Sequence, residues 1–281
     1  MITLLPPHGS KLLKGSTRLG CGGHSVVYAS VDPFGGFHNV AVKVPRLGSE
    51  KSIKRELDAL GHIGRHENII KLFGTINTDD GATGIVLERY DSDLFMEVST
   101  NGPFNNQRAA LVMYQLVSAV AFVHAKWVVI CDIKPENVLI RYTRGTEQVA
   151  ICDFGLCHKV GAPIDQLVGT AALLPPEGLE KGVAGKPRDV WALGVLLFGV
   201  LSGLSAFDRR CWRETKKAIK YDPVPTESMP CDTSHDAKEL ILSLLEKNPA
   251  DRPTAQEILE VDRFVLSGSL RAPFVDMSNC S

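Results

Sequence analysis

The sequence predicts an α+β fold with two lobes, a small antiparallel β-sheet that carries one helix and a larger, mainly helical part. Short β-prone runs separated by glycine-rich or polar turns fill the first third of the chain, and a single helical pattern interrupts them. Helical patterns dominate from about Asp93 onward. We expect an N-terminal lobe over residues 1–88 and a C-terminal lobe over 89–281.

The individual elements follow from local periodicity. Strands are predicted at 26–28, 40–42 and 84–87, where apolar and β-branched residues cluster. A helix is predicted where apolar residues recur at steps of three and four, at Ile53, Leu57, Leu60 and Ile63. Later helices are expected at 108–126, 189–202 and 236–247, and Thr254 with Glu257 predicts a capping box that starts a last helix.

Composition excludes several classes of protein. The formal net charge of −1 provides no basic surface for a phosphate backbone, so we expect no nucleic-acid partner. Seven scattered cysteines without a Cys-x-x-Cys pair favour a reducing compartment, cytoplasmic or nuclear, over a disulfide framework or a zinc site. The N-terminus lacks a signal-peptide pattern, and the apolar run 193–204 is too short to span a bilayer, so no membrane partner is expected.

A glycine-rich segment, 19–27, joins two predicted strands. Glycines at 20, 22 and 23 would let backbone N–H groups approach phosphates closely, although a plain tight hairpin has the same pattern. Lys43 follows on the next predicted strand, and Glu56 lies on the predicted helix. A helix carboxylate could therefore pair with a strand lysine and hold it on the phosphates.

Three motifs follow in order in the second part of the chain. They read Asp132-Ile-Lys134-Pro-Glu136-Asn137-Val-Leu139, Cys152-Asp153-Phe154-Gly155 and Leu174-Pro175-Pro176-Glu177. With the glycine-rich segment, Lys43 and Glu56, this set resembles the signature of eukaryotic-type protein kinases of the serine/threonine class. The resemblance runs from about residue 18 to residue 252 and implies ATP and Mg2+ as cofactors and a protein Ser/Thr hydroxyl as acceptor.

The resemblance also implies the role of each residue. Lys43, oriented by Glu56, would hold the α- and β-phosphates, and Asp153 and Asn137 would hold magnesium. Asp132 would accept the proton of the substrate hydroxyl, and Lys134 would steady the transferred phosphate. The ATP-binding residues it implies are Leu19, Gly20, Cys21, Gly22, Gly23, His24, Ser25, Val27, Ala41, Lys43, Leu87, Glu88, Tyr90, Asp93, Glu136, Leu139 and Asp153.

Four further residues are expected to support the site without touching ATP. By resemblance, His124 braces the catalytic loop, Asp189 accepts hydrogen bonds from N–H groups of that loop, and Arg252 pairs with Glu177.

Regulation is predicted from a departure from the family pattern. Cys131 stands where the resemblance expects the arginine that reads a phosphorylated activation segment, and residues 156–168 contain no serine, threonine or tyrosine. Thr170 is expected to contact Asp132 and Lys134, so that phosphorylation there would inhibit. We therefore predict an enzyme that is active without phosphorylation of its activation segment.

Two alternatives are weighed against an active protein kinase. A pseudokinase scaffold would bind ATP without turnover, but Lys43, Asp132 and Asp153 are all present. A small-molecule kinase of related architecture would lack the Pro-Glu end of the activation segment at Glu177 and the Asp-x-Trp pair at Asp189. The oligomeric state is not specified by any of these patterns.

Overall fold

The computed structural model describes residues 3–4, 17–31, 39–77, 81–143, 145–165 and 167–269. It divides into two compact units, Met1–Tyr90 with Cys152–Cys157 and Asp91–Ile151 with His158–Ser281. The short segment around Asp153 thus belongs with the first unit, whereas the predicted ranges 1–88 and 89–281 placed it in the second lobe. Those ranges otherwise stay a prediction.

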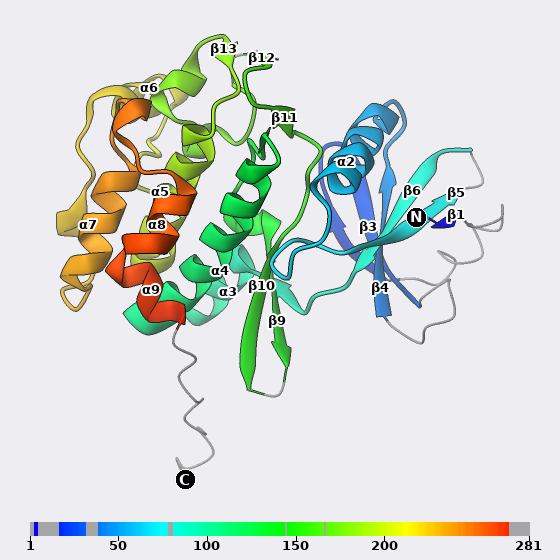
Figure 1. Cartoon of the computed structure of the whole chain (residues 1–281), viewed down its shortest axis with the longest axis horizontal. Helices are drawn as coiled ribbons and strands as arrows, with labels where there is room; N and C mark the ends of the chain where they lie inside the picture. The colour runs from blue at the N-terminus through cyan, green and yellow to red at the C-terminus, as the bar shows by residue number, and fades with distance from the viewer. Residues whose placement is uncertain are drawn as a thin grey trace. The chain divides into compact units, whose positions relative to one another are not determined.

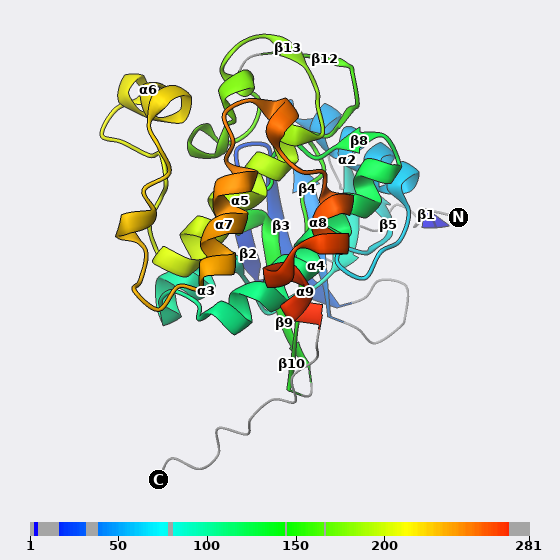
Figure 2. The same ribbon diagram turned by 60° about the vertical axis from the view of Figure 1, so that its left-hand side comes forward.

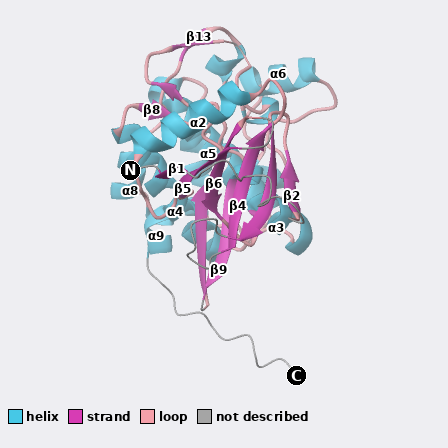
Figure 3. Ribbon diagram, turned by 90° about the vertical axis from the view of Figure 1, so that its right-hand side faces the viewer, coloured by secondary structure: helices cyan, strands magenta, loops and turns pink. Residues whose placement is uncertain are grey.

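The first unit is built on a six-stranded sheet with the order β1-β5-β6-β4-β3-β2 (Figures 1 and 3). Neighbouring strands pair antiparallel, except that β1 runs parallel to β5. The strands predicted at 26–28, 40–42 and 84–87 are confirmed as β3, β4 and β6. The bounds are β1 Thr3–Leu4, β2 Arg18–Cys21, β3 Ser25–Val31, β4 Asn39–Pro45, β5 Leu72–Asn77 and β6 Thr83–Glu88.

Helix α2, Glu50–Ile63, lies in this unit and packs on β4 and β6 (Figure 1). Its apolar positions Ile53, Leu60 and Ile63 are buried, as their spacing predicts. Glu56 is buried on the same face, so the helix carries one carboxylate into the interior. The Glu56 carboxylate therefore lies within reach of Lys43 on β4.

The second unit is mainly helical, with α4 packed against α5, α8 and α9 (Figure 2). Its helices are α3 Leu94–Asn101, α4 Asn106–Ala125, α5 Pro187–Ser202, α6 Trp212–Tyr221, α7 His235–Leu244, α8 Ala255–Val261 and α9 Arg263–Ser269. Its strands are β7 Ser92–Asp93, β8 Val128–Val129, β9 Val138–Thr143, β10 Thr146–Ile151, β11 His158–Lys159, β12 Pro163–Ile164 and β13 Gly182–Val183.

The predicted helices of this unit are confirmed as α4, α5 and α7, with ends that differ by a few residues. Asn105 caps α4 by accepting a hydrogen bond from the Arg108 N–H, and Pro187 occupies the first turn of α5. The capping box of Thr254 and Glu257 starts α8 as predicted. The expectation that this helix is the last one is wrong, because α9 follows it directly.

Helix α4 is long and apolar enough to span a membrane, with a mean hydropathy of 1.4. However, 56% of the apolar window is buried inside the protein, and the helix packs against α5, α8, α9 and β10. These contacts make α4 a core helix of the second unit.

Candidate active site

The glycine-rich segment forms a tight turn between β2 and β3. Gly22 donates its N–H to the carbonyl oxygen of Ser25 at 2.9 Å, and Gly20 and Cys21 pair with Val27 and Val26 across the strands. Ser25 is buried, whereas the residues of the turn from Cys21 to His24 are exposed. The turn therefore presents exposed backbone, as a phosphate-covering loop requires.

Lys43 connects two carboxylates inside the first unit. Its Nζ lies 2.6 Å from Oε2 of Glu56 and 3.0 Å from Oδ1 of Asp153. Lys43 and Glu56 are buried, whereas the Asp153 side chain is 41% exposed. The predicted pairing of the strand lysine with the helix carboxylate is confirmed, and Asp153 joins it.

Burial and charge act in opposite directions on this pair. Burial alone would lower the pKa of Lys43, but the carboxylates of Glu56 and Asp153 raise it above its ordinary value. Burial raises the pKa of the Glu56 carboxyl, and the ammonium of Lys43 opposes that shift. Lys43, together with the backbone of Phe154, therefore favours the charged form of Glu56.

Asp153 has an unusual backbone conformation, with φ of +60°. Its Oδ1 accepts a hydrogen bond from the Gly155 N–H at 3.2 Å, and Arg55 of α2 donates to the Gly155 carbonyl at 3.3 Å. A left-handed non-glycine residue is strained, and strain of this kind persists where surrounding contacts enforce it. These contacts aim the half-exposed carboxylate beside Lys43.

The residues predicted to line the adenine in the first unit lie on adjacent strands. Ala41 and Leu87 are cross-strand partners of β4 and β6, and Val27 is the partner of Lys43 between β3 and β4. Leu19, in β2, is 45% exposed. Glu88 ends β6, and Tyr90 is buried shortly after it.

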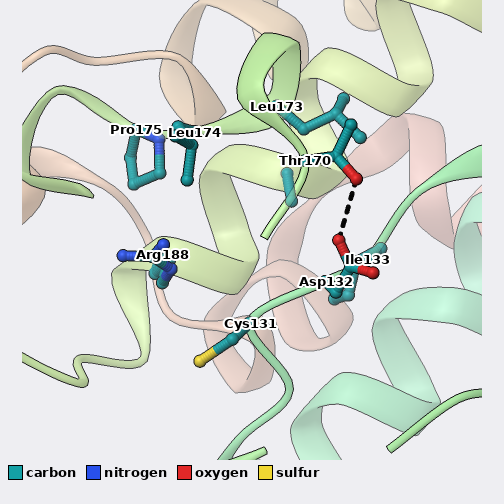
Figure 4. Close-up of a pocket in the computed structure, with 9 residues that line it drawn as sticks. Cys131, Asp132, Ile133, Thr170, Leu173, Leu174, Pro175 and Arg188 are labelled. Atoms are coloured by element: carbon teal, nitrogen blue, oxygen red, sulfur yellow. Dashed lines mark hydrogen bonds between the residues drawn. The ribbon is translucent and has the colours of Figure 1, made fainter. Parts of the chain in front are cut away.

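A second constellation lies wholly in the second unit, around Asp132 (Figure 4). Thr170 donates its hydroxyl to Oδ1 of Asp132 at 2.9 Å, and Nζ of Lys134 lies 2.7 Å from Oδ2. Lys134 also donates to the Thr170 oxygen at 3.2 Å. The predicted contacts of Thr170 with both residues are therefore confirmed.

Asn137 lies in a short 3-10 helix, Pro135–Asn137, that follows the catalytic loop. Its Nδ2 donates to the backbone oxygen of Asp132 at 2.9 Å and to Oδ2 at 3.2 Å. The amide oxygen is the atom that suits a hard cation such as Mg2+. Glu136, beside it, is exposed.

Asp93 and Leu139 are antiparallel partners between β7 and β9. Oδ1 of Asp93 accepts a hydrogen bond from the Met96 N–H at 2.8 Å and caps α3. Its carboxylate thus has a structural task that its sequence position alone did not predict.

The loop that carries Asp132 is held by Asp189, at the start of α5. Asp189 accepts hydrogen bonds from the N–H groups of Ile130 at 2.8 Å and Cys131 at 2.9 Å, and His124 Nε2 lies 2.9 Å from its Oδ2. Cys131 has a φ of +70°, so these bonds hold a strained residue directly before Asp132. The supporting roles predicted for His124 and Asp189 are consistent with these contacts.

The end of the activation segment is held by an ion pair that was predicted and by contacts that were not. Arg252 forms two hydrogen bonds to the Glu177 carboxylate, at 2.7 and 2.9 Å, as expected. Unpredicted is the position of Gly169, where φ is +101° and an added Cβ would lie 2.6 Å from the Cys131 carbonyl oxygen. Only glycine fits there, and the Gly169-Thr170 pair was the available sequence signal.

A second unpredicted residue is Arg188, whose Nη2 donates to the carbonyl oxygen of Val168. Arg188 lines one cavity with Cys131, Asp132, Thr170 and Pro175 (Figure 4). Its neighbour Asp189 belongs to a recognised motif, whereas Arg188 matches none, and its partner lies 20 residues away in the sequence.

These two constellations, a strand lysine paired with a helix carboxylate and an aspartate-lysine catalytic loop, define the class of phosphate-transferring protein kinases. Comparison with protein families agrees. The model of the protein kinase domain matches residues 13–264, and the chain belongs to this family.

Known relatives include an Aurora kinase of Dictyostelium discoideum, 35% identical over 211 residues. Calcium-dependent protein kinase 7 of Arabidopsis thaliana is 31% identical over 224 residues, and each alignment covers 75% of this chain. A probable serine/threonine-protein kinase, pXi of Dictyostelium discoideum, is 30% identical over 226 residues and 78% of this chain. The alignments span 53%, 40% and 31% of these relatives' lengths.

Proposed function

We propose that the protein transfers the γ-phosphate of ATP to serine or threonine hydroxyls of protein substrates, without phosphorylation of its own activation segment. The observation that carries the proposal is the arrangement at Asp132, which Thr170 and Lys134 contact directly in an unmodified chain. The names of the aligned Aurora and calcium-dependent kinases favour protein as the acceptor. We further propose that the protein acts in the cytoplasm or nucleus.

On the nucleotide side, Lys43 holds the α- and β-phosphates, and Glu56 orients it. The turn from Gly20 to Ser25 covers the phosphates with backbone N–H groups, and apolar residues receive the adenine. Asp153 and Asn137 are the residues that would hold Mg2+, through the carboxylate and amide oxygens that this ion prefers, and the ion would supply positive charge against the phosphates.

On the acceptor side, Asp132 accepts the proton of the attacking hydroxyl, because its carboxylate is fixed by Thr170 and Asn137. Lys134, paired with Asp132, places a positive charge where the transferred phosphoryl group passes. Catalysis then consists of positioning and charge stabilisation, which suits phosphoryl transfer.

The test is transfer from γ-labelled ATP with magnesium to an array of serine, threonine and tyrosine peptides. Asp153→Asn is the matched control, since it removes one charge at nearly constant shape. We expect labelled serine or threonine, and a fall of about 100-fold or more in the control. Mainly phosphotyrosine would contradict the proposed acceptor, and ATP binding by a folded wild type without transfer would favour a scaffold.

A further inference from the structure

Arg188 is a buried cation in an unfavourable place. It is 5% exposed and lies in the first turn of α5, where the helix dipole repels positive charge. Its Nε has no hydrogen-bond partner, and no described carboxylate forms an ion pair with it. Burying a charge without an opposite partner costs folding free energy. Stability of the fold alone therefore does not explain this residue.

The Arg188 guanidinium forms a hydrogen bond to the activation segment. Its Nη2 donates to the Val168 carbonyl, two residues before the Thr170 hydroxyl that contacts Asp132. The backbone of this stretch is strained, because Leu167 has a φ of +63°. Strained backbone keeps its conformation only where other contacts enforce it, and Arg188 is one of these contacts.

Two further contacts hold residues 167–169 against the rest of the second unit. Leu167 donates its N–H to the Gly178 carbonyl at 3.2 Å, and Gly169 packs against the Cys131 carbonyl. Arg188 and Cys131 line the same cavity, to which Arg188 contributes a cation and Cys131 a neutral thiol (Figure 4).

We infer that Arg188 is a positioning residue, which supplies from α5 the guanidinium that holds the activation segment in the geometry where Thr170 contacts Asp132. The inference rests on the proposed function and specifies which residue holds the activation segment in place when no phosphate is attached to it. One fixed cation performs this task from the helix side of the cavity.

The test compares Arg188→Met with Arg213→Met, an exposed arginine of α6. Methionine fills most of the arginine volume but removes its charge and donors. We expect kcat at saturating ATP and peptide to fall at least about tenfold in Arg188→Met, since the lost hydrogen bond comes from a charged group. The KM for ATP should change less than about twofold, and the melting temperature should not fall, because an unpaired buried charge is removed. Arg213→Met should change none of the three.

Two results would overturn the inference. Arg188→Met could keep the wild-type kcat, or its melting temperature could fall together with its activity, which would make Arg188 a structural residue only. An inactive wild type would instead defeat the proposed function itself, so the two failures are distinguishable.

A double-mutant cycle provides an independent arm. Cys131→Arg alone should lower kcat, because two guanidinium groups would share one cavity. The double variant Cys131→Arg/Arg188→Met should have a kcat at least about tenfold higher than Cys131→Arg, since a single cation is then left in the cavity to hold the segment. Additive losses in the double variant would contradict the inference.

Discussion

Glu56 is completely buried, and the ammonium of Lys43 is the main group that opposes the rise of its pKa on burial. Its Oε2 contacts Lys43 at 2.6 Å, and the backbone of Phe154 also favours the ionised carboxylate by lowering its pKa. A lysine variant that is made to abolish catalysis therefore also changes the titration of Glu56. That consequence can be measured without any activity assay.

We predict that Lys43→Met loses stability as the pH rises above the ordinary pKa of a glutamate carboxyl, more steeply than wild type. Without Lys43, burial keeps the Glu56 carboxyl protonated in the folded state, whereas the unfolded chain ionises above about pH 4.3. Unfolding then releases a proton, and the free energy of unfolding falls by up to about 1.4 kcal/mol per pH unit until the raised folded pKa is reached. Urea denaturation at several pH values measures this slope. Lys43→Met/Glu56→Gln should lack it, and equal slopes in both variants would disprove the argument.

The hydrogen bond from Thr170 to Asp132 leads to a second prediction at the level of single residues. Thr170→Ala should lower kcat about tenfold or more, because it removes the hydrogen bond that Thr170 donates to Oδ1 of Asp132. Thr170→Ser keeps the hydroxyl and should stay within about threefold of wild type. Steady-state kinetics of the pair decides the matter: similar rates for alanine and serine would show that the contact has no catalytic consequence.

Residue contacts were predictable where residue type and spacing carry the chemistry. Lys43 with Glu56, and Glu177 with Arg252, were expected from the sequence and form in the structure. The contact of Arg188 with Val168 was not, because a backbone carbonyl gives no side-chain signal. Long-range contacts to backbone are set by tertiary packing and leave little trace in a single sequence.

At the scale of elements, α5 joins the catalytic loop to the helical core. It holds Asp189 at its start, and further along the helix Gly194 packs directly on α7 and the residue after it. A Cβ at Gly194 would lie 2.8 Å from Cβ of Leu244 and 2.9 Å from Leu245, whereas one at Gly199 would meet only the Leu204 carbonyl at 3.5 Å. A side chain at position 194 would therefore clash with its neighbours, whereas position 199 has room for a methyl group.

We predict that Gly194→Ala destabilises the protein by about 1–3 kcal/mol, because overpacking outweighs the better helix propensity of alanine. Gly199→Ala, in the same helix, should be neutral or stabilising by up to about 1 kcal/mol. Thermal or urea denaturation gives both values. If Gly194→Ala and Gly199→Ala changed the free energy of unfolding equally, that result would contradict the close packing of α5 on α7.

Helix existence was easier to predict than helix ends. Apolar periodicity located α4, α5 and α7, but α5 starts earlier than predicted, because Pro187 suits a first turn. Helix α9, Arg263–Ser269, was not predicted. It has only seven residues, and Asp262 alone separates it from α8. A helix this short carries too few repeats to show a clear period, and it is held by packing on α4.

At the scale of the whole molecule, each unit contributes a different part of the proposed reaction. The first unit carries the lysine and Asp153 for the nucleotide, and the second carries Asp132 with its own anchored activation segment. The anchors of that segment are Arg188, Gly169 and the Glu177–Arg252 pair, and none of them needs a modification. We therefore expect an activity that does not depend on phosphorylation of this segment.

The measurement that tests this claim most directly is the initial rate of phosphate transfer before and after phosphatase treatment. The protein would be made in a host without upstream kinases, and mass spectrometry would verify that Thr170 is unmodified. We predict transfer to serine or threonine at a rate that phosphatase leaves unchanged within about twofold, and that Asp153→Asn lowers about 100-fold or more. A preparation that is inert until another kinase phosphorylates Thr170 would contradict the account.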